Sequence, residues 1–155
     1  MLTATDFSYA MPDDEFWRRA VIKSIERLSG KTRLWNLYEG YRREASGDDF
    51  FEQAIRRLEL TIRINVGGLS QIPKTGPLIV VANHPLGVVD GLMLGYLISR
   101  VRNDFRILVH SALCKVPEPR EHFLPIDFLT TRMAQQTNLD TRRAALADLD
   151  AGRVV

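Results

Sequence analysis

Apolar residues recur at helical spacing through the first third of the chain, in three segments separated by polar or glycine-containing breaks. The first segment starts with acidic residues and ends before Gly30, which predicts a helix over residues 13–29. Two more apolar stripes predict amphipathic helices on either side of the Ser-Gly pair at 46–47. The stripes consist of Leu34, Leu37, Tyr38 and Tyr41, and of Phe51, Ile55, Leu58 and Ile62.

Beyond residue 61 the pattern changes to alternation and then to an unbroken apolar run. Residues 62–66 alternate apolar and polar side chains before a Gly-Gly pair, which predicts a strand or the exit from a helix. Residues 72–77 contain two prolines and a glycine and predict a turn. The run from Leu78 to Ala82 is typical of a strand buried on both faces of a parallel sheet.

The second half of the chain alternates helical and extended patterns. We expect a helix over 91–101, strands over 106–110 and 123–128, and a last helix over 142–151. Asp140 or Thr141 can cap this last helix, and Gly152 can stop it.

Arg153 to Val155 has the character of the first residues of another buried strand, so we expect the natural chain to continue beyond Val155. Strands that alternate with helices predict an α/β fold. The expected architecture is a partial, mainly parallel sheet with flanking helices, preceded by amphipathic helices. We assign residues 1–66 to the N-terminal helical segment and residues 67–155 to the α/β part.

Composition restricts the class of protein. The 155 residues are 45% hydrophobic and 26% charged, which fits an ordinary globular domain and excludes a disordered chain. A net charge of +2 does not favour a nucleic-acid partner. The single cysteine, Cys114, cannot form an intramolecular disulfide, which fits a reducing compartment. Because we find neither a secretory signal nor a membrane-spanning run, we expect a cytoplasmic protein that can lie peripherally on the cytoplasmic membrane.

The segment ANHPLGVVDG, residues 82–91, follows the predicted strand directly. Ligands of open α/β sheets bind at the carboxyl ends of strands, which is where His84 stands. Pro85 ends the strand, Gly87 permits a sharp turn, and Asp90 can cap the next helix. We therefore expect the turn to bring Asp90 back towards His84.

Together, a histidine and an aspartate can act as a general base and its orienting group. A neutral imidazole, with an ordinary pKa of about 6.5, can take a proton from an alcohol, and a carboxylate on its other nitrogen stabilises the imidazolium. Residues 82–91 contain no serine or cysteine, which favours direct attack by a substrate hydroxyl. Spacing alone also allows a purely structural His84–Asp90 contact, and the segment offers too few ligands for a closed metal site.

The run IPKTGPLIVVANHPLGVVDG, residues 72–91, resembles the first sequence block of the PlsC-like glycerolipid and lysophospholipid acyltransferases. That block has a proline-glycine turn, an apolar strand, and Asn-His followed by Asp after four residues. Here five residues, Pro85 to Val89, separate His84 from Asp90. The pattern NHPxGxxDG resembles a bacterial branch labelled as haemolysins and related to lyso-ornithine-lipid acyltransferases, and Gly87 can absorb the additional residue as a bulge.

The resemblance implies acyl transfer from a thioester of coenzyme A or acyl carrier protein to the hydroxyl of a lysolipid at a membrane surface. It implies no metal and no bound cofactor. In this interpretation His84 is the general base and Asp90 orients it. Asn83, Gly87 and Gly91 belong to the substrate-binding turn.

A second resemblance involves residues 112–117 and 123–128, which are similar to the middle region of the family. That region ends in an Ile-Asp-Arg type of sequence that helps to bind acceptor phosphate, and Phe128 stands where the arginine would be. Lys115 or Arg132 can replace that arginine, although each is also typical of a solvated surface charge. An acceptor without a phosphomonoester, such as a lyso-ornithine lipid, also accounts for the loss.

The similarity covers roughly residues 70–155, and a further family block, a strand ending in Phe-Pro-Glu-Gly or a variant, would begin at Arg153. The isolated fragment is then expected to hold only the N-terminal part of the acyltransferase domain. His110 and His122 are expected to be loop or strand-end residues rather than ligands. The predicted helix over 13–29 carries basic residues around an apolar face, which suits either an anionic membrane surface or core packing.

Two other functions remain open from the residues alone. A hydrolase of thioesters or lipids would use water in place of the alcohol. A non-catalytic lipid-binding domain would need neither His84 nor Asp90.

Overall fold

The computed structural model describes residues 36, 38–42 and 49–155 of the chain. The predicted helix over 13–29 and the apolar positions Leu34 and Leu37 lie outside the described residues. Residues 38–42 are helical, as the second apolar stripe predicts, and the rings of Tyr38 and Tyr41 stack with their centroids 6.5 Å apart. Residues 49–155 form a compact unit of their own and carry the candidate site.

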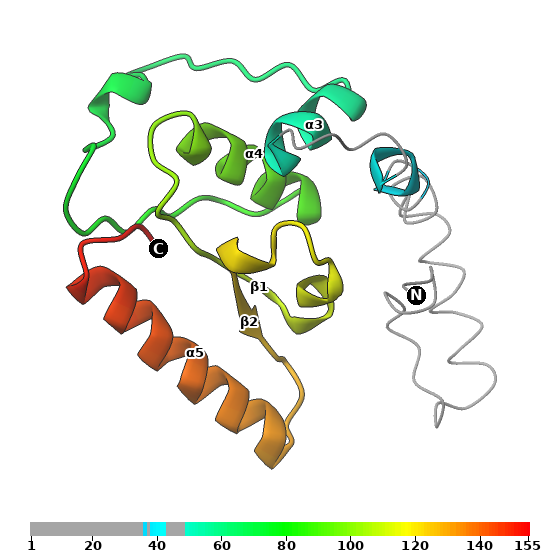
Figure 1. The fold of residues 1–155 in the computed structure, drawn as a ribbon, viewed down its shortest axis with the longest axis vertical. Helices are drawn as coiled ribbons and strands as arrows, with labels where there is room; N and C mark the ends of the chain where they lie inside the picture. The colour runs from blue at the N-terminus through cyan, green and yellow to red at the C-terminus, as the bar shows by residue number, and fades with distance from the viewer. Residues whose placement is uncertain (1–35, 37, 43–48) are drawn as a thin grey trace. The chain divides into compact units, whose positions relative to one another are not determined.

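The unit of residues 49–155 mixes helices and parallel strands (Figure 1). Its longer elements are α3 (Phe50–Arg57), α4 (Val88–Ser99), β1 (Ile107–His110), β2 (Phe123–Ile126) and α5 (Arg132–Asp150). Short 3-10 helices occupy Leu69–Gln71, Ser111–Lys115 and Arg120–His122. This arrangement confirms the α/β fold class, whereas the boundary between residues 66 and 67 stays a prediction.

The third helical stripe forms α3, and Asp49 caps it. An Asp49 carboxylate oxygen accepts a hydrogen bond from the Phe51 amide at 2.9 Å, which satisfies one of the open donors of the first turn. The helix ends at Arg57, and Glu59 has a positive φ of 54°, a left-handed conformation that does not continue a helix. Residues 62–66 form neither helix nor strand, so the strand alternative for this segment was wrong, and α3 ends before it at Arg57.

Four parallel segments lie side by side in the order 78–80, 153–155, 105–110 and 123–126. β1 pairs with β2 in register from Ile107–Phe123 to His110–Ile126. Val154 forms parallel bridges with Leu78 on one side and Phe105 on the other. Residues 153–155 therefore pair in the manner of a strand between two parallel neighbours, and Val154 is buried, which agrees with the prediction of a buried strand there.

The segment from Leu78 to Ala82 differs from its prediction. Leu78 and Val80 pack against the core, and the Val80 amide donates to the Val155 carbonyl at 2.9 Å. Ile79 and Val81 point to the other face and are exposed. The prediction of a strand buried on both faces was thus wrong for this segment, because the described residues cover only one of its two faces.

The core is built around Phe51, Ile98, Phe105 and Val154, which come from α3, α4 and two of the parallel segments. α4 begins three residues before the predicted position 91, and it packs closely against α3. An added Cβ on Gly95 would lie 2.3 Å from the Phe51 ring, so this contact requires the absence of a side chain. The core therefore fixes the helix that carries Asp90.

The last helix is longer than predicted, because α5 begins at Arg132 and not at 142. Thr131 caps it by accepting from the Ala134 amide at 3.1 Å, so the expected caps Asp140 and Thr141 lie inside the helix. The Thr141 hydroxyl donates to the Pro125 carbonyl at 2.6 Å, which attaches α5 to β2. Polar contacts anchor the first turns of α5, and for this reason the apolar pattern does not reveal them.

Gly152 ends α5 as predicted. Its φ of +77° is left-handed, which favours glycine, and its amide donates to the Leu149 carbonyl at 2.9 Å. The Arg153 amide donates to the Asp148 carbonyl at 2.9 Å, which completes a Schellman type of helix end. The chain thus turns sharply from α5 into the inner parallel segment.

Candidate active site

The structure brings His84 and Asp90 together. The Nδ1 atom of His84 lies 3.5 Å from Oδ2 of Asp90, within ion-pair range but longer than an ordinary hydrogen bond. The His84 side chain is 68% exposed and that of Asp90 only 12%. The aspartate is therefore held inside the turn, and the imidazole is open to solvent and to a substrate.

Asp90 is the third residue of α4 and not its N-cap, which is Gly87. The expectation of an N-capping Asp90 was wrong because the helix begins earlier, at Val88. Oδ2 of Asp90 accepts a hydrogen bond from the Leu86 amide at 2.7 Å, so the carboxylate reaches back over four residues to the chain before the helix. A carboxylate in the first helical turn also complements the positive end of the helix dipole.

Gly87 gives the turn its shape. It has φ +62° and ψ −127°, a conformation that residues with a side chain adopt only under strain. The Asp90 amide donates to the Gly87 carbonyl at 3.0 Å. This glycine thus permits a five-residue spacing between His84 and Asp90 while their side chains stay close.

The arrangement defines the chemistry available to His84. Because Nδ1 faces the carboxylate, the neutral ring can hold its proton on Nδ1 and leave the Nε2 lone pair for a substrate proton. A nearby carboxylate also stabilises the imidazolium that forms when Nε2 takes a proton. The geometry can therefore support general-base chemistry on a hydroxyl group.

The other candidate binding residues lie at different places. Asn83 is exposed beside His84, and Gly91 follows Asp90 in α4 with no atom within 4 Å of an added Cβ. Lys115 is the exposed last residue of the short helix Ser111–Lys115, and Arg132 is the exposed first residue of α5. Their part in acceptor binding stays a prediction.

His110, the last residue of β1, lies together with Phe128, which follows the carboxyl end of β2. Their ring centroids are 5.7 Å apart, and Phe128 is exposed. Nδ1 of His110 accepts from the Ala112 amide at 3.1 Å and so caps the short helix that follows. His110 is therefore a strand-end residue, as expected, and its side chain adds an aromatic surface to the edge of the sheet at which His84 stands.

His122 has a structural place at the edge of the core. Its ring stacks on Phe105 with a centroid distance of 4.2 Å, and its Nδ1 donates to the Phe105 carbonyl at 3.0 Å. Cys114 is half-buried, and burial raises the pKa of its thiol, which does not favour a reactive thiolate. Neither residue has the surroundings of a nucleophile or of an exposed base.

Within residues 36, 38–42 and 49–155, no three histidine, cysteine or acidic side chains are grouped so as to hold a metal ion. The helices in that part of the chain also include none that is long and apolar enough to cross a membrane.

The contact that the sequence analysis missed is the hydrogen bond from the Leu86 amide, which holds the Asp90 carboxylate. An acidic residue in the first turn of a helix was the available signal for it, because such side chains often bond the backbone before the helix.

Comparison with known proteins gives a family and two similar enzymes. The family model described as Acyltransferase matches residues 63–151. A lyso-glycine lipid O-acyltransferase from Phocaeicola vulgatus is 31% identical over 96 residues, which cover 61% of this chain and 33% of that protein. An enzyme of the same name from Bacteroides thetaiotaomicron is 35% identical over 80 residues, which cover 52% of this chain and 28% of that protein. The chain thus matches about a third of the length of these relatives, and no solved structure matches it.

Proposed function

The chain belongs to the Acyltransferase family, in the PlsC-like superfamily, and from this premise we propose that the natural protein transfers a fatty acyl group from an acyl thioester to the hydroxyl of a lysolipid. The observation that carries the proposal is the pair of His84 and Asp90, with Nδ1 and Oδ2 3.5 Å apart in a turn that leaves the imidazole exposed. Family membership supports the reaction class, and the pair supports the mechanism.

In the proposed mechanism Nε2 of His84 accepts the proton of the acceptor hydroxyl while the hydroxyl oxygen attacks the thioester carbonyl. A carbon–oxygen bond forms, the carbon–sulfur bond breaks, and the imidazolium returns the proton to the leaving thiolate. Asp90 orients the ring and stabilises its transient positive charge. The products are an acylated lipid and a free thiol, so the atoms and charges balance without an enzyme-bound intermediate.

We propose that the acceptor is a lysolipid with an amino-acid head group and no phosphomonoester. Both similar enzymes are named for a lyso-glycine lipid, which supports this class. The family resemblance adds to it, because Phe128 stands where that resemblance implies a phosphate-binding arginine. The acyl donor is a thioester of coenzyme A or acyl carrier protein. Lys115 and Arg132 are the proposed contacts for the carboxylate of such a head group.

A lysolipid acceptor resides in a bilayer, so we place the reaction at the cytoplasmic membrane surface, with the protein bound there peripherally. In this proposal Asn83, Gly87 and Gly91 form the turn that the acceptor hydroxyl approaches. The exposure of His84 fits an approach from outside the turn.

The deciding experiment replaces His84 with alanine in the natural protein that contains this sequence. Transfer of a radiolabelled acyl chain from a thioester to lyso-glycine lipid should fall by about 10²- to 10⁴-fold, the usual contribution of a general base. The melting temperature should hardly change, because the His84 side chain is 68% exposed. Retained transfer in a folded His84→Ala protein would reject the mechanism.

Asp90→Asn is the matched variant that separates charge from position. The amide oxygen of asparagine can still accept from the Leu86 amide, but it cannot stabilise an imidazolium as a carboxylate does. We expect a smaller loss of transfer than for His84→Ala.

The exposure of His84 also admits water, which keeps a thioester hydrolase as the second candidate. Free thiol should be released much faster with lysolipid than without it if the protein is a transferase. Equal rates would favour the hydrolase.

A further inference from the structure

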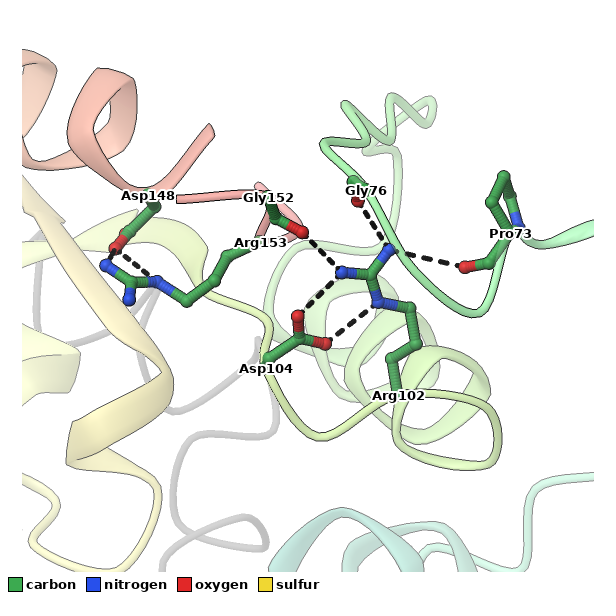
Figure 2. A network of polar contacts seen from close by, with 7 residues as sticks. All are labelled: Pro73, Gly76, Arg102, Asp104, Asp148, Gly152 and Arg153. Atoms are coloured by element: carbon green, nitrogen blue, oxygen red, sulfur yellow. Dashed lines mark hydrogen bonds and ion pairs between the residues drawn. The ribbon is translucent and has the colours of Figure 1, made fainter. Parts of the chain in front are cut away.

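Arg102 is a buried charged residue whose side chain hydrogen-bonds to four other residues (Figure 2). Its side chain is only 3% exposed. Nε and Nη2 donate to the two carboxylate oxygens of Asp104 at 2.8 and 2.6 Å, and Nη2 also donates to the Gly152 carbonyl at 2.7 Å. Nη1 donates to the carbonyls of Gly76 at 2.7 Å and Pro73 at 3.3 Å. These bonds use all five N–H groups of the guanidinium, which a lysine ammonium cannot reproduce.

The acceptors of Arg102 share one position in the fold. Gly76, Asp104 and Gly152 lie one or two residues before the start of three neighbouring parallel segments, at Leu78, Phe105 and Arg153. The hydrogen bonds of these segments begin directly beyond them. The Leu78 amide donates to the Arg153 carbonyl at 3.3 Å, and the Val154 amide donates to the Asp104 carbonyl at 3.1 Å. One buried guanidinium therefore joins the starts of three segments that are far apart in the sequence.

Arg102 also connects the two elements that carry the candidate active site. The segment 78–80 leads along the chain into His84, and the helix α4 carries Asp90 and ends just before Arg102. The Arg102 amide donates to the Ile98 carbonyl of α4 at 2.8 Å, while its side chain holds the turn before Leu78. The junction at Arg102 thus lies at the opposite end of both elements from His84 and Asp90.

We propose that Arg102 is a positioning residue that fixes the register of segment 78–80 against segment 153–155, and through it the place of His84 relative to Asp90. This proposal rests on the acyltransferase function proposed above. A displacement of about 1 Å at a reacting group can cost about 10²-fold in rate, so a small shift in register is enough to matter. Arg102 acts through the backbone and does not touch the substrate.

The test compares Arg102→Lys with Arg100→Lys in the natural protein. Arg100 lies at the same helix end, but it forms an exposed ion pair with Glu52 at 2.9 Å, so it controls for loss of an arginine there. Below the melting temperature of both variants, we expect Arg102→Lys to lower kcat at least about tenfold with little change in KM. Arg100→Lys should keep both parameters within about twofold.

A second measurement does not depend on catalysis. The amides of Val80 and Val155 donate between the two segments, and their hydrogen exchange should accelerate at least about tenfold in Arg102→Lys. The Leu58 amide, which donates to the Ala54 carbonyl at the end of α3 away from this junction, should change much less. If wild-type protein transfers no acyl group, the proposed function fails, and exchange at Val80 and Val155 still decides the structural part of the proposal.

Faster exchange together with a lower kcat supports the proposal. Unchanged exchange overturns the register role, and faster exchange with unchanged kcat overturns the link to His84. If Arg102→Lys does not fold, Asp104→Asn takes its place, because it weakens one side of the same junction and leaves the carbonyl acceptors in position. It should shift both readouts in the same direction by about threefold, and no shift in either readout would overturn the proposal.

Discussion

The two ends of the parallel segments differ in how far their charged and titratable side chains are buried and hydrogen-bonded. Where the segments begin, Arg102 is buried and every one of its N–H groups has an acceptor. Where they end, His84 is largely exposed and its contact with Asp90 is long. A network with no open donors resists rearrangement, whereas an exposed turn gives a substrate access to the imidazole. The molecule thus places a buried, fully hydrogen-bonded arginine at one end of the sheet and an exposed histidine at the other.

The end of the sheet at which the parallel segments begin, called the closed end, also carries the buried Asp148. Its carboxylate is buried and accepts from Arg106 Nη1 at 3.2 Å and from Arg153 Nε at 2.9 Å. Arg106 and Arg153 belong to neighbouring parallel segments. Asp148 lies in the last turn of α5, and Figure 2 shows its carboxylate bonded to Arg153. A buried carboxylate is costly unless it is paired and hydrogen-bonded, and here two arginines satisfy it. The ion pairs of Asp148 therefore attach α5 to two of the parallel segments.

The largest expected effect on stability comes from a substitution in α4. This helix runs from the exposed turn of residues 84–90, called the open turn, into the core. Gly95→Ala would place a Cβ 2.3 Å from Phe51, whose ring also packs against Phe105 and His122 and cannot move freely. We expect a loss of about 3 kcal/mol in unfolding free energy, the upper range for overpacking. Gly91→Ala, one turn earlier with open space around it, should change stability by less than about 1 kcal/mol. Urea denaturation of the two variants measures the difference, and equal losses would contradict the contrast between the crowded Gly95 and the open Gly91.

A smaller effect is expected at the open turn itself. Gly87→Ala forces a side chain onto a residue with φ +62°, which should cost about 1–2 kcal/mol if the turn keeps its shape. Because the turn is exposed, we expect it to relax partly, so that stability falls by about 1 kcal/mol while acyl transfer falls about tenfold. Transfer assays and urea denaturation on the same preparation separate these outcomes. Unchanged transfer would show that the shape of the turn does not set the position of Asp90.

The smallest effect concerns pH at the closed end. The hydrogen bonds from Arg102 hold the pKa of the Asp104 carboxyl below its ordinary value of 3.8. Ionised Asp104 therefore stabilises the folded state above that value, and the stabilisation is lost as pH falls through the lowered pKa. Since the Asp104 side chain is 44% exposed, solvent screens the pair and we expect a contribution below about 1 kcal/mol.

The measurement compares unfolding free energies of wild type and Asp104→Asn at pH 6 and near pH 2.5. The difference should be present at pH 6 and smaller near pH 2.5, because the stabilisation is lost as pH falls through the lowered pKa. Asp140→Asn is the control, because Asp140 forms an exposed pair with Arg143 at 3.0 Å. A difference of the same size at both pH values would mean that the charge of Asp104 is not the stabilising feature.

Local signals in the sequence predicted several features correctly. The third apolar stripe predicted α3, and the extended patterns over 106–110 and 123–128 predicted β1 and β2 to within two residues. The histidine, proline, glycine and aspartate of residues 84–90 predicted a turn that brings two side chains together. These signals succeed because caps, turns and side-chain periodicity act over a few neighbouring residues.

Signals that depend on distant partners were missed or misplaced. The first turns of α5 are polar, and they are attached to the chain after β2 by Asn138, whose amide group exchanges hydrogen bonds of 2.9 and 2.8 Å with the backbone of Asp127. The apolar run at 78–82 predicted two covered faces, but coverage depends on which other elements pack there. An apolar pattern states what a segment can bury and not what is present to cover it.

By itself, the sequence determined the family, the α/β class and the turn that brings His84 and Asp90 together, because all of these depend on short contiguous segments. Only the tertiary structure decided that a single arginine at position 102 joins three segments. Its acceptors at 73, 76, 104 and 152 include three backbone carbonyls, and every residue has such a carbonyl. No side-chain pattern can mark a carbonyl as an acceptor, so the closed end of the sheet becomes visible only when the chain has folded.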